Sequence, residues 1–295
     1  MQLRTRHDLN DRSAATASRD SQPLVEVITH PELVRALERT TRPMPIPASI
    51  SAFIDAQAKH SPTSYEDMRV VVFNGTTKRS PEQSHTDGLL AIPLGIFSAL
   101  GVRCDEIRTV DRTIPPGLWP DMREHGYDED DFPEIYRSLV EPADILLIAG
   151  PIWLGDQSSQ TRTIIERLYA YSSEINDRGQ WAYYGKVGGV LTTGNEDGGK
   201  HVSAQVLYAL QHIGLVIPPQ SDAYWVGEAG PGPSYLDQDG GGEQNAWTTR
   251  NTVFMTWNML QMARMLKDSG GFPAYGNSTH DWDLEHREHP NPEYR

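Results

Sequence analysis

The sequence predicts an α/β fold in which helices cover both faces of a parallel sheet. From Met68 to about Leu266, apolar runs of strand length alternate with segments of helical periodicity. Two of these runs, VVVF at residues 70–73 and DILLIA at residues 144–149, are nearly continuous in their apolar character. Continuous apolar strands are typical of a parallel sheet that is buried on both faces.

Five strands and five helices are expected in this region. The first strand is VVVF, and the helix after it ends near Gly101. The fourth strand is KVGGVLT, and two adjacent prolines, Pro218 and Pro219, split the fifth. The predicted strands are residues 70–73, 102–110, 144–149, 186–192 and 215–217 with 223–226, and the predicted helices are residues 87–100, 132–140, 157–171, 199–213 and 245–266.

Two connections stand out between these elements. Residues 111–131 form a connection that is longer than ordinary loops, and such length often has a functional reason. Residues 227–242 are rich in glycine and proline. Both connections favour an enzyme over a compact carrier protein.

The charge of the chain limits its partners. Its 26 basic and 40 acidic residues give a net charge of −14. Nucleic acids and anionic membranes both attract positive surfaces, so we expect neither as a partner. No apolar stretch approaches the ~20 residues that cross a bilayer, and the N-terminal residues lack the apolar segment of a secretory signal.

The single cysteine, Cys104, excludes an intramolecular disulfide and suits a reducing cytoplasm. It falls in a predicted strand, where a small core residue is favoured over a nucleophile. We therefore expect a cytoplasmic protein whose cysteine is structural.

The ends of the chain differ in composition from its centre. The first residues are polar and rich in Ser, Arg and Asp, which is typical of disorder. An arm follows, in which a Pro-rich stretch precedes a short helix from Ser49 or Ser51. Near the C-terminus, residues 280–289 include metal-ligand types, but a solvated tail is favoured and no metal site is expected. The predicted regions are a disordered tail, an N-terminal arm with short helices, a main domain and a polar acidic C-terminal tail, at residues 1–22, 23–67, 68–267 and 268–295.

The loop after the first strand reads NGTTKRSPEQSHTD and predicts a phosphate site. Ser84 can cap the following helix, with Asp87 completing a capping box, and helix N-termini attract phosphate. Hydroxyl side chains and two cations surround this cap. The GxGxxG and GxxxxGK[ST] patterns are absent, so a terminal phosphomonoester is favoured over a pyrophosphate. The alternative is a tight hairpin turn at Asn74 and Gly75, with hydroxyls that only cap the helix. The donors are Thr76, Thr77, Lys78, Arg79, Ser84 and Thr86.

Two further loops follow the third and fourth strands. GPIWLGDQSSQ offers a flat apolar side chain, Trp153, beside Gly155, although Trp153 could equally be ordinary packing. TTGNEDGGKH offers glycines and the amide of Asn195, although it could equally be a solvated turn. The carboxyl ends of parallel strands share one edge of a sheet, where ligands bind. We therefore expect the three loops to meet.

Three segments, FNGTTKRSPEQSHTDGLL, GPIWLGDQSSQ with the following TRTIIERL, and TTGNEDGGKH, resemble the flavodoxin-like NAD(P)H-dependent FMN reductase and quinone reductase family. The resemblance covers about two thirds of the chain. It implies a flavodoxin-like three-layer sandwich with a five-stranded parallel sheet in the order 2-1-3-4-5, and it makes residues 68–267 an FMN-binding domain. This chain departs from the family pattern in its longer first loop and its N-terminal extension.

The resemblance also implies a role for each loop. The first loop would hold the FMN phosphate, the second would lie along the isoalloxazine ring and ribityl chain, and the third would border the pyrimidine side of the ring. The implied residues are Thr76, Lys78, Ser84, His85 and Thr86 in the first loop; Pro151, Ile152, Trp153, Leu154 and Gly155 in the second; and Thr193, Gly194, Asn195, Glu196 and Gly198 in the third.

The implied activity is transfer of hydride from NADPH or NADH through bound FMN to a small acceptor, such as a flavin or a quinone, in a ping-pong cycle. The flavin supplies the chemistry, so no catalytic side chain is expected. A homodimer or homotetramer is implied as well. The alternatives are a flavodoxin-type carrier that binds FMN without NAD(P)H turnover, and a flavin-free scaffold.

Overall fold

The computed structural model describes residues 44–228, 230 and 232–285. The predicted tail at 1–22, the first part of the predicted arm and the last ten residues, with His286 and His289, lie outside the described residues. Helix α2, Ala48–Lys59, follows Pro47 close to the predicted start. Within the described residues, no helix is long and apolar enough to span a membrane.

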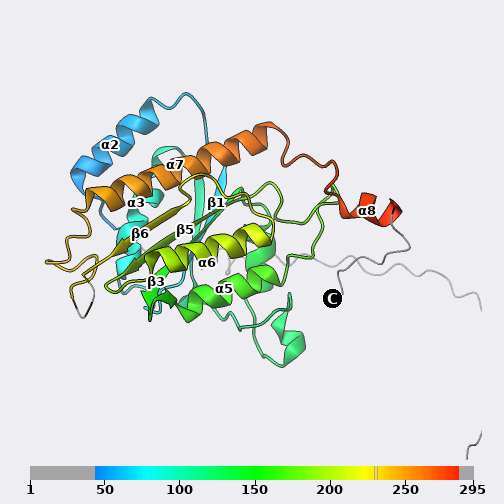
Figure 1. Ribbon diagram of the computed structural model, residues 1–295, viewed down its shortest axis with the longest axis horizontal. Coiled ribbons are helices and arrows are strands. Elements are labelled where there is room, and N and C mark those ends of the chain that lie inside the picture. Colours follow the sequence, from blue (N-terminus) through cyan, green and yellow to red (C-terminus); the bar gives the residue numbers. More distant parts are fainter. Residues whose placement is uncertain (1–43, 229, 231, 286–295) are drawn as a thin grey trace, which may run out of the picture. The chain divides into compact units, whose positions relative to one another are not determined.

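The centre of the fold is a sheet with the strand order β2-β1-β3-β5-β6. All neighbours in this order pair in parallel (Figure 1). The predicted parallel order 2-1-3-4-5 is therefore confirmed, counting these strands along the chain. The strands are β1 (Arg69–Asn74), β2 (Arg103–Arg108), β3 (Ile145–Trp153), β5 (Val187–Gly194) and β6 (Asp222–Val226).

A sixth strand corrects the predicted count of five. Strand β4, Asp156–Gln157, pairs antiparallel with the end of β3. The turn between them consists of Leu154 and Gly155, which both have positive φ, at 52° and 76°. Two consecutive residues with positive φ are typical of a tight two-residue hairpin turn. As a result, β3 extends past the predicted end at residue 149 and carries Pro151 and Trp153 on a strand.

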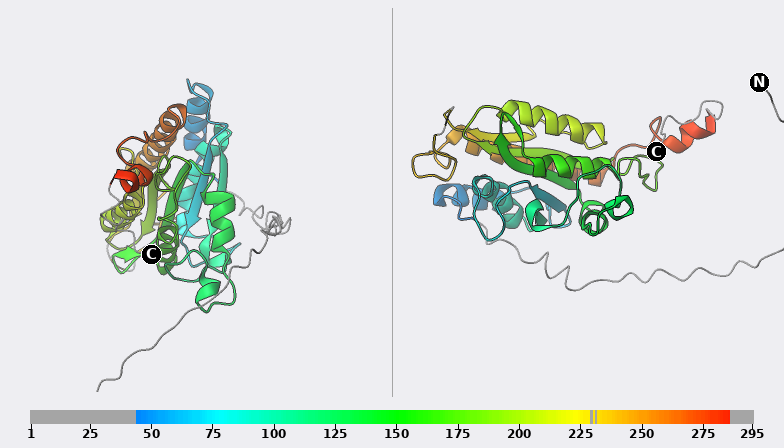
Figure 2. Two further views of the ribbon diagram at one scale, coloured as in Figure 1. Left: turned by 90° about the vertical axis from the view of Figure 1, so that its right-hand side faces the viewer. Right: turned by 90° about the horizontal axis from the view of Figure 1, so that it is seen from below.

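Helices form two layers around the sheet (Figures 1 and 2). Helices α3 and α7 pack together on one face, and α5 and α6 cover the other, which confirms the three-layer arrangement. Helix α2 packs against α3. The helix bounds are α3 (His85–Ala99), α4 (Phe132–Ile135), α5 (Ser159–Tyr169), α6 (Gly199–His212), α7 (Ala246–Asp268) and the short α8 (Thr279–Glu285).

Two predicted elements differ in detail. The predicted helix at 132–140 is a single α-helical turn, α4, followed by the π-helical turn η3, Tyr136–Val140. The first half of the predicted fifth strand makes only one bridge, between Val216 and Val187. The prolines that follow lack an N–H group and cannot continue the ladder, so β6 begins only at Asp222.

The long connection between β2 and α4 is anchored by a buried ion pair. Arg167 of α5 and Asp130 are both fully buried, and their Nη2 and Oδ2 atoms are 2.6 Å apart. The same guanidinium donates to the carbonyl oxygens of Trp119 and Pro120, at 2.9 Å each. One side chain of a helix thus fixes the path of a connection that lacks regular structure over most of its length.

Cys104 lies on β2, is half-buried and packs against the core, as predicted. Burial raises the pKa of its thiol, and the neighbouring Glu106 and Asp105 raise it further. Because the thiolate is the reactive form, we expect the native protein to react with a disulfide reagent at least about tenfold more slowly than the urea-unfolded chain. Equal rates in a colorimetric thiol assay would show that this environment does not protect Cys104.

Candidate functional site

The first loop ends in the predicted helix cap. The Ser84 hydroxyl accepts from the Asp87 N–H at 3.1 Å, and the Asp87 carboxylate accepts from the Ser84 N–H at 2.7 Å. This reciprocal pair is a capping box at the start of α3. Strand β1 pairs in parallel on both sides up to Asn74, so no hairpin forms at Asn74 and Gly75.

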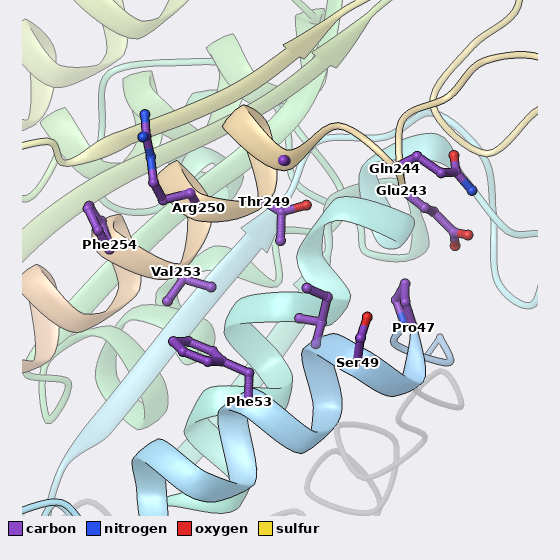
Figure 3. A pocket seen from close by; sticks show the side chains of 11 residues that line it. Pro47, Ser49, Phe53, Glu243, Gln244, Thr249, Arg250, Val253 and Phe254 are labelled. Carbon is purple, nitrogen blue, oxygen red and sulfur yellow. The ribbon is translucent and has the colours of Figure 1, made fainter.

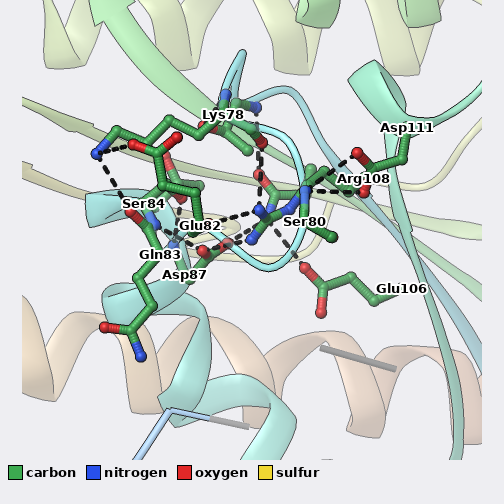
Figure 4. A network of polar contacts seen from close by, with 12 residues as sticks. Lys78, Ser80, Glu82, Gln83, Ser84, Asp87, Glu106, Arg108 and Asp111 are labelled. Atoms are coloured by element: carbon green, nitrogen blue, oxygen red, sulfur yellow. Dashed lines mark hydrogen bonds and ion pairs between the residues drawn. The ribbon is translucent and has the colours of Figure 1, made fainter. Parts of the chain in front are cut away.

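A buried arginine from β2 supports this loop from the side of the sheet (Figure 4). The Nη2 atom of Arg108 lies 2.5 Å from the Asp87 carboxylate, and its Nη1 donates to the carbonyl oxygens of Lys78 and Glu82 at 3.2 and 2.7 Å. The side chain of Arg108 is only 5% exposed. Its positive charge is therefore paired within the protein, where it stabilises the conformation of the loop. Sequence analysis missed this residue because it lies on a different strand, without a local pattern that links it to the loop.

The entrance and the middle of the loop are also fixed. The Asn74 amide donates to Asp87 at 2.6 Å and to Glu106 at 2.9 Å, and its oxygen accepts from the Thr76 N–H at 3.2 Å. The Ser80 N–H donates to the Asp111 carboxylate at 3.1 Å. These contacts hold the backbone in one shape before a ligand binds, which lowers the entropic cost of binding.

The three predicted loops meet in one cavity of about 150 Å³ at the carboxyl edge of the sheet. The hydroxyls of Thr86 and Thr193 lie 3.2 Å apart and join the first loop to the third. Complete small-molecule sites usually enclose about 300–1,000 Å³, so this cavity suits one part of a ligand, with the rest on the open rim. The lining residues are Thr76, Thr77, Lys78, Ser84, His85, Thr86, Pro151, Ile152, Trp153, Thr193, Gly194, Asn195, Trp225, Ser234 and Tyr235.

Five of the predicted site residues lie outside this cavity. Arg79 is exposed on the first loop. Leu154 is at the tip of the β3–β4 hairpin and is 96% exposed. Glu196 is exposed on the third loop. Gly155 and Gly198 pack against each other so closely that a Cβ atom on Gly198 would lie 2.7 Å from the Gly155 carbonyl oxygen. The two glycines, which have no side chain, allow the second and third loops to approach each other closely.

The cavity has a polar end and an apolar end. At the polar end, Thr76, Ser84 and Thr86 are buried, and Lys78 is half-buried, with its Nζ 3.3 Å from the Glu82 carboxylate. At the apolar end, Trp153 is 45% exposed on the rim. Buried hydroxyls with one adjacent cation fit a phosphate, and an exposed indole offers a flat surface for a ring.

Four aromatic residues in the connections before α4 and before β5 do not contribute to this cavity. Trp119 stacks on His125, with ring centroids 4.3 Å apart, and Tyr127 is exposed. Tyr183 is fully buried in the core. Neither these three residues nor Trp181 lines the cavity.

A larger groove of about 520 Å³ lies between α2 and the start of α7 (Figure 3). Its side chains are mainly apolar, with Phe53 and Val253 facing each other across it. None of its lining residues belongs to the three strand-end loops, so it is separate from the predicted site.

Comparison with known proteins agrees with this geometry. Residues 68–229, more than half of the chain, match the family described as NADPH-dependent FMN reductase. The chain belongs to this family. Its flavodoxin-like fold and its cofactors, FMN with NAD(P)H as reductant, follow the family, and it is a flavoprotein oxidoreductase. The donors at the polar end of the cavity fit the phosphate of FMN.

Two curated relatives of this FMN reductase family member are informative. It is 35% identical to the 8-demethyl-8-aminoriboflavin-5′-phosphate synthase of Streptomyces davaonensis, over 68% of this chain and 79% of that protein. It is 55% identical to a Mycobacterium bovis protein named divalent metal cation transporter MntH, over 70% of this chain. It spans only 30% of the length of the latter protein.

A solved structure gives the same picture of the fold. RosB, in complex with the intermediate 8-demethyl-8-formylriboflavin-5′-phosphate, aligns with a TM-score of 0.66 and 32% identity. The alignment covers 77% of this chain and 90% of RosB.

Proposed function

We propose that this chain is an FMN-dependent oxidoreductase in which NAD(P)H reduces the flavin and a small acceptor then oxidises it at the same place, in a ping-pong cycle. The observation that carries the proposal is the meeting of three strand-end loops in one cavity that has a polar end, rich in hydroxyl groups, and an aromatic side chain on its rim.

Each loop has a distinct task in this proposal. Thr76, Ser84 and Thr86 donate hydroxyl groups to the phosphate, and Lys78 supplies the positive charge. Bound FMN would accept hydride from NAD(P)H and pass it to the acceptor. Pro151, Ile152 and Trp153 support one side of the ring, which leaves the opposite side open to reactants.

The third loop orients the pyrimidine edge of the ring. Thr193 and Gly194 present backbone groups at the end of β5, and Asn195 donates its amide to the Gly232 carbonyl oxygen at 3.0 Å. This donation fixes the Asn195 side chain with its oxygen available to accept from a ring N–H. Glu196 would act only as an outer neighbour, because it lies outside the cavity.

The acceptor is proposed as a small molecule such as a flavin or a quinone. A homodimer or homotetramer and a cytoplasmic location are proposed from the family resemblance and the single cysteine. Gel filtration with light scattering tests the oligomeric state.

The proposed activity predicts a yellow protein whose colour bleaches when NADPH or NADH is added without oxygen. Bleaching should require one equivalent of nucleotide per flavin, because hydride carries two electrons. Anaerobic visible spectroscopy measures both. A colourless protein that FMN cannot reconstitute would contradict the proposal, and a yellow protein that neither nucleotide bleaches would favour the flavodoxin-type carrier.

A second function is favoured by the synthase relative, whose name states a flavin 5′-phosphate product. The similarity extends over 79% of that relative, so the flavin itself could be a substrate here. Mass spectrometry of the bound flavin, before and after turnover, separates the two functions. An unchanged FMN mass supports the reductase, and a changed mass supports a flavin-modifying enzyme.

A further inference from the structure

A segment between β6 and α7 closes one side of the cavity. We call residues 232–236 the strap. The Gly232 carbonyl oxygen accepts from the Asn195 amide at 3.0 Å, and the Leu236 N–H donates to His85 Nδ1 at 3.1 Å. The strap is therefore tied at one end to the third loop and at the other end to the start of α3.

The middle of the strap forms part of the cavity wall. Ser234 and Tyr235 line the cavity, and Tyr235 is only 3% exposed. Its ring packs edge-to-face on Trp225, with centroids 5.7 Å apart. Leu236 packs on Gly88, where a Cβ atom would lie 2.5 Å from Leu236 Cδ2. The strap therefore packs against specific residues of α3 and β6.

We propose that Ser234 and Tyr235 form a fourth wall of the flavin site, and that His85 is the positioning residue that holds this wall closed through its Nδ1 atom. The proposal rests on the proposed function, since it assigns the cavity to FMN. His85 has two possible roles, one for each ring nitrogen. Its Nδ1 atom can hold the strap, and its Nε2 atom can donate a hydrogen bond to the phosphate.

The hydrogen bond defines the state of His85. Nδ1 accepts from a backbone N–H, so the neutral ring carries its proton on Nε2. Burial lowers the pKa of His85 below its ordinary value of 6.5; nearby Lys78 also lowers it, while Asp237 raises it. Protonation would put a hydrogen on Nδ1 opposite the Leu236 N–H and break the bond. The strap is expected to open as the pH falls below 6.5.

Two substitutions separate the roles of the two nitrogens. His85→Asn places an acceptor near the Nδ1 position and removes the Nε2 donor, whereas His85→Gln places a donor near Nε2 and removes the Nδ1 acceptor. We expect the H85Q protein to release FMN about tenfold faster than wild type, and the H85N protein within about twofold of it. Stopped-flow flavin fluorescence measures release. The reverse order, or equal rates for both variants, would overturn the proposal.

A pair of glycine substitutions tests the strap without changing any residue that lines the cavity. Gly88→Ala would push on Leu236, and should speed FMN release several-fold. Gly95→Ala is the matched control on the same helix, because its Cβ would meet Ile46, 2.3 Å away, on the α2 side. Alanine favours the helix at both positions. The proposal would be contradicted if G88A left the rate of FMN release unchanged, or if G95A changed this rate as much as G88A does.

The pH dependence gives a third readout. Release from wild type should accelerate below pH 6.5 more than release from H85N, which lacks the titrating group. Equal acceleration would show that His85 does not control the strap. If wild type binds no FMN at all, the proposed function fails as well, whereas FMN binding without these differences refutes only the role of the strap.

Discussion

Replacing Ser84 by aspartate is expected to abolish FMN retention. The Ser84 hydroxyl is buried at the polar end of the cavity, where the proposed phosphate would sit. A carboxylate there would repel the phosphate by about 4 kcal/mol per pair of unit charges at 4 Å and an effective dielectric of 20, which is roughly a thousandfold in affinity. Flavin content after purification and an FMN titration by fluorescence measure the loss.

Ser84→Asn is the matched control. Asparagine and aspartate are both good helix N-caps, so α3 keeps its start in either variant and only the charge differs. The S84N protein should therefore bind FMN far more tightly than the S84D protein. Equal flavin content in the S84D protein and wild type would mean that the phosphate lies elsewhere.

Replacing Arg167 by methionine is expected to destabilise the fold by about 3–5 kcal/mol, because it leaves the carboxylate of Asp130 buried without its cation. For a domain of this size, such a loss lowers the melting temperature by roughly 10 °C or more. The carbonyl oxygens of Trp119 and Pro120 also lose their donor. Thermal unfolding followed by circular dichroism measures the effect.

Arg162→Met provides the comparison on the same helix. Arg162 pairs with Glu166 on the surface, and its side chain is 58% exposed. Exposed pairs of this kind contribute little, so this substitution should change stability by less than about 0.5 kcal/mol. If both variants unfold at the same temperature, the buried pair does not anchor the connection as described.

The parts of the site that the sequence predicted depend on short-range rules. The capping box could be predicted because Ser84 and Asp87 are three residues apart, and that spacing alone defines the motif. The meeting of the loops could be predicted because parallel strands place their carboxyl ends at one edge. Neither prediction required knowledge of side-chain packing.

The parts that the sequence missed depend on long-range contacts. Arg108 supports the first loop from a neighbouring strand, and the strap reaches the site through Tyr235, from a loop that only its Gly and Pro content distinguished. The hairpin at Leu154 was missed because a leucine at positive φ is rare outside turns that the surrounding structure imposes. The extra residues of the first loop have a physical explanation here: Arg108 and Asp111 bind their backbone.

The most direct test of the account compares the affinities of FMN and riboflavin, which differ only in the phosphate. If the first loop binds this group through charge-assisted hydrogen bonds, each worth about 1.5–3 kcal/mol, FMN should bind at least about a hundredfold more tightly than riboflavin. Fluorescence titration of the flavin-free protein measures both dissociation constants. Equal affinities would contradict the assignment of the loop at the start of α3 as the phosphate site.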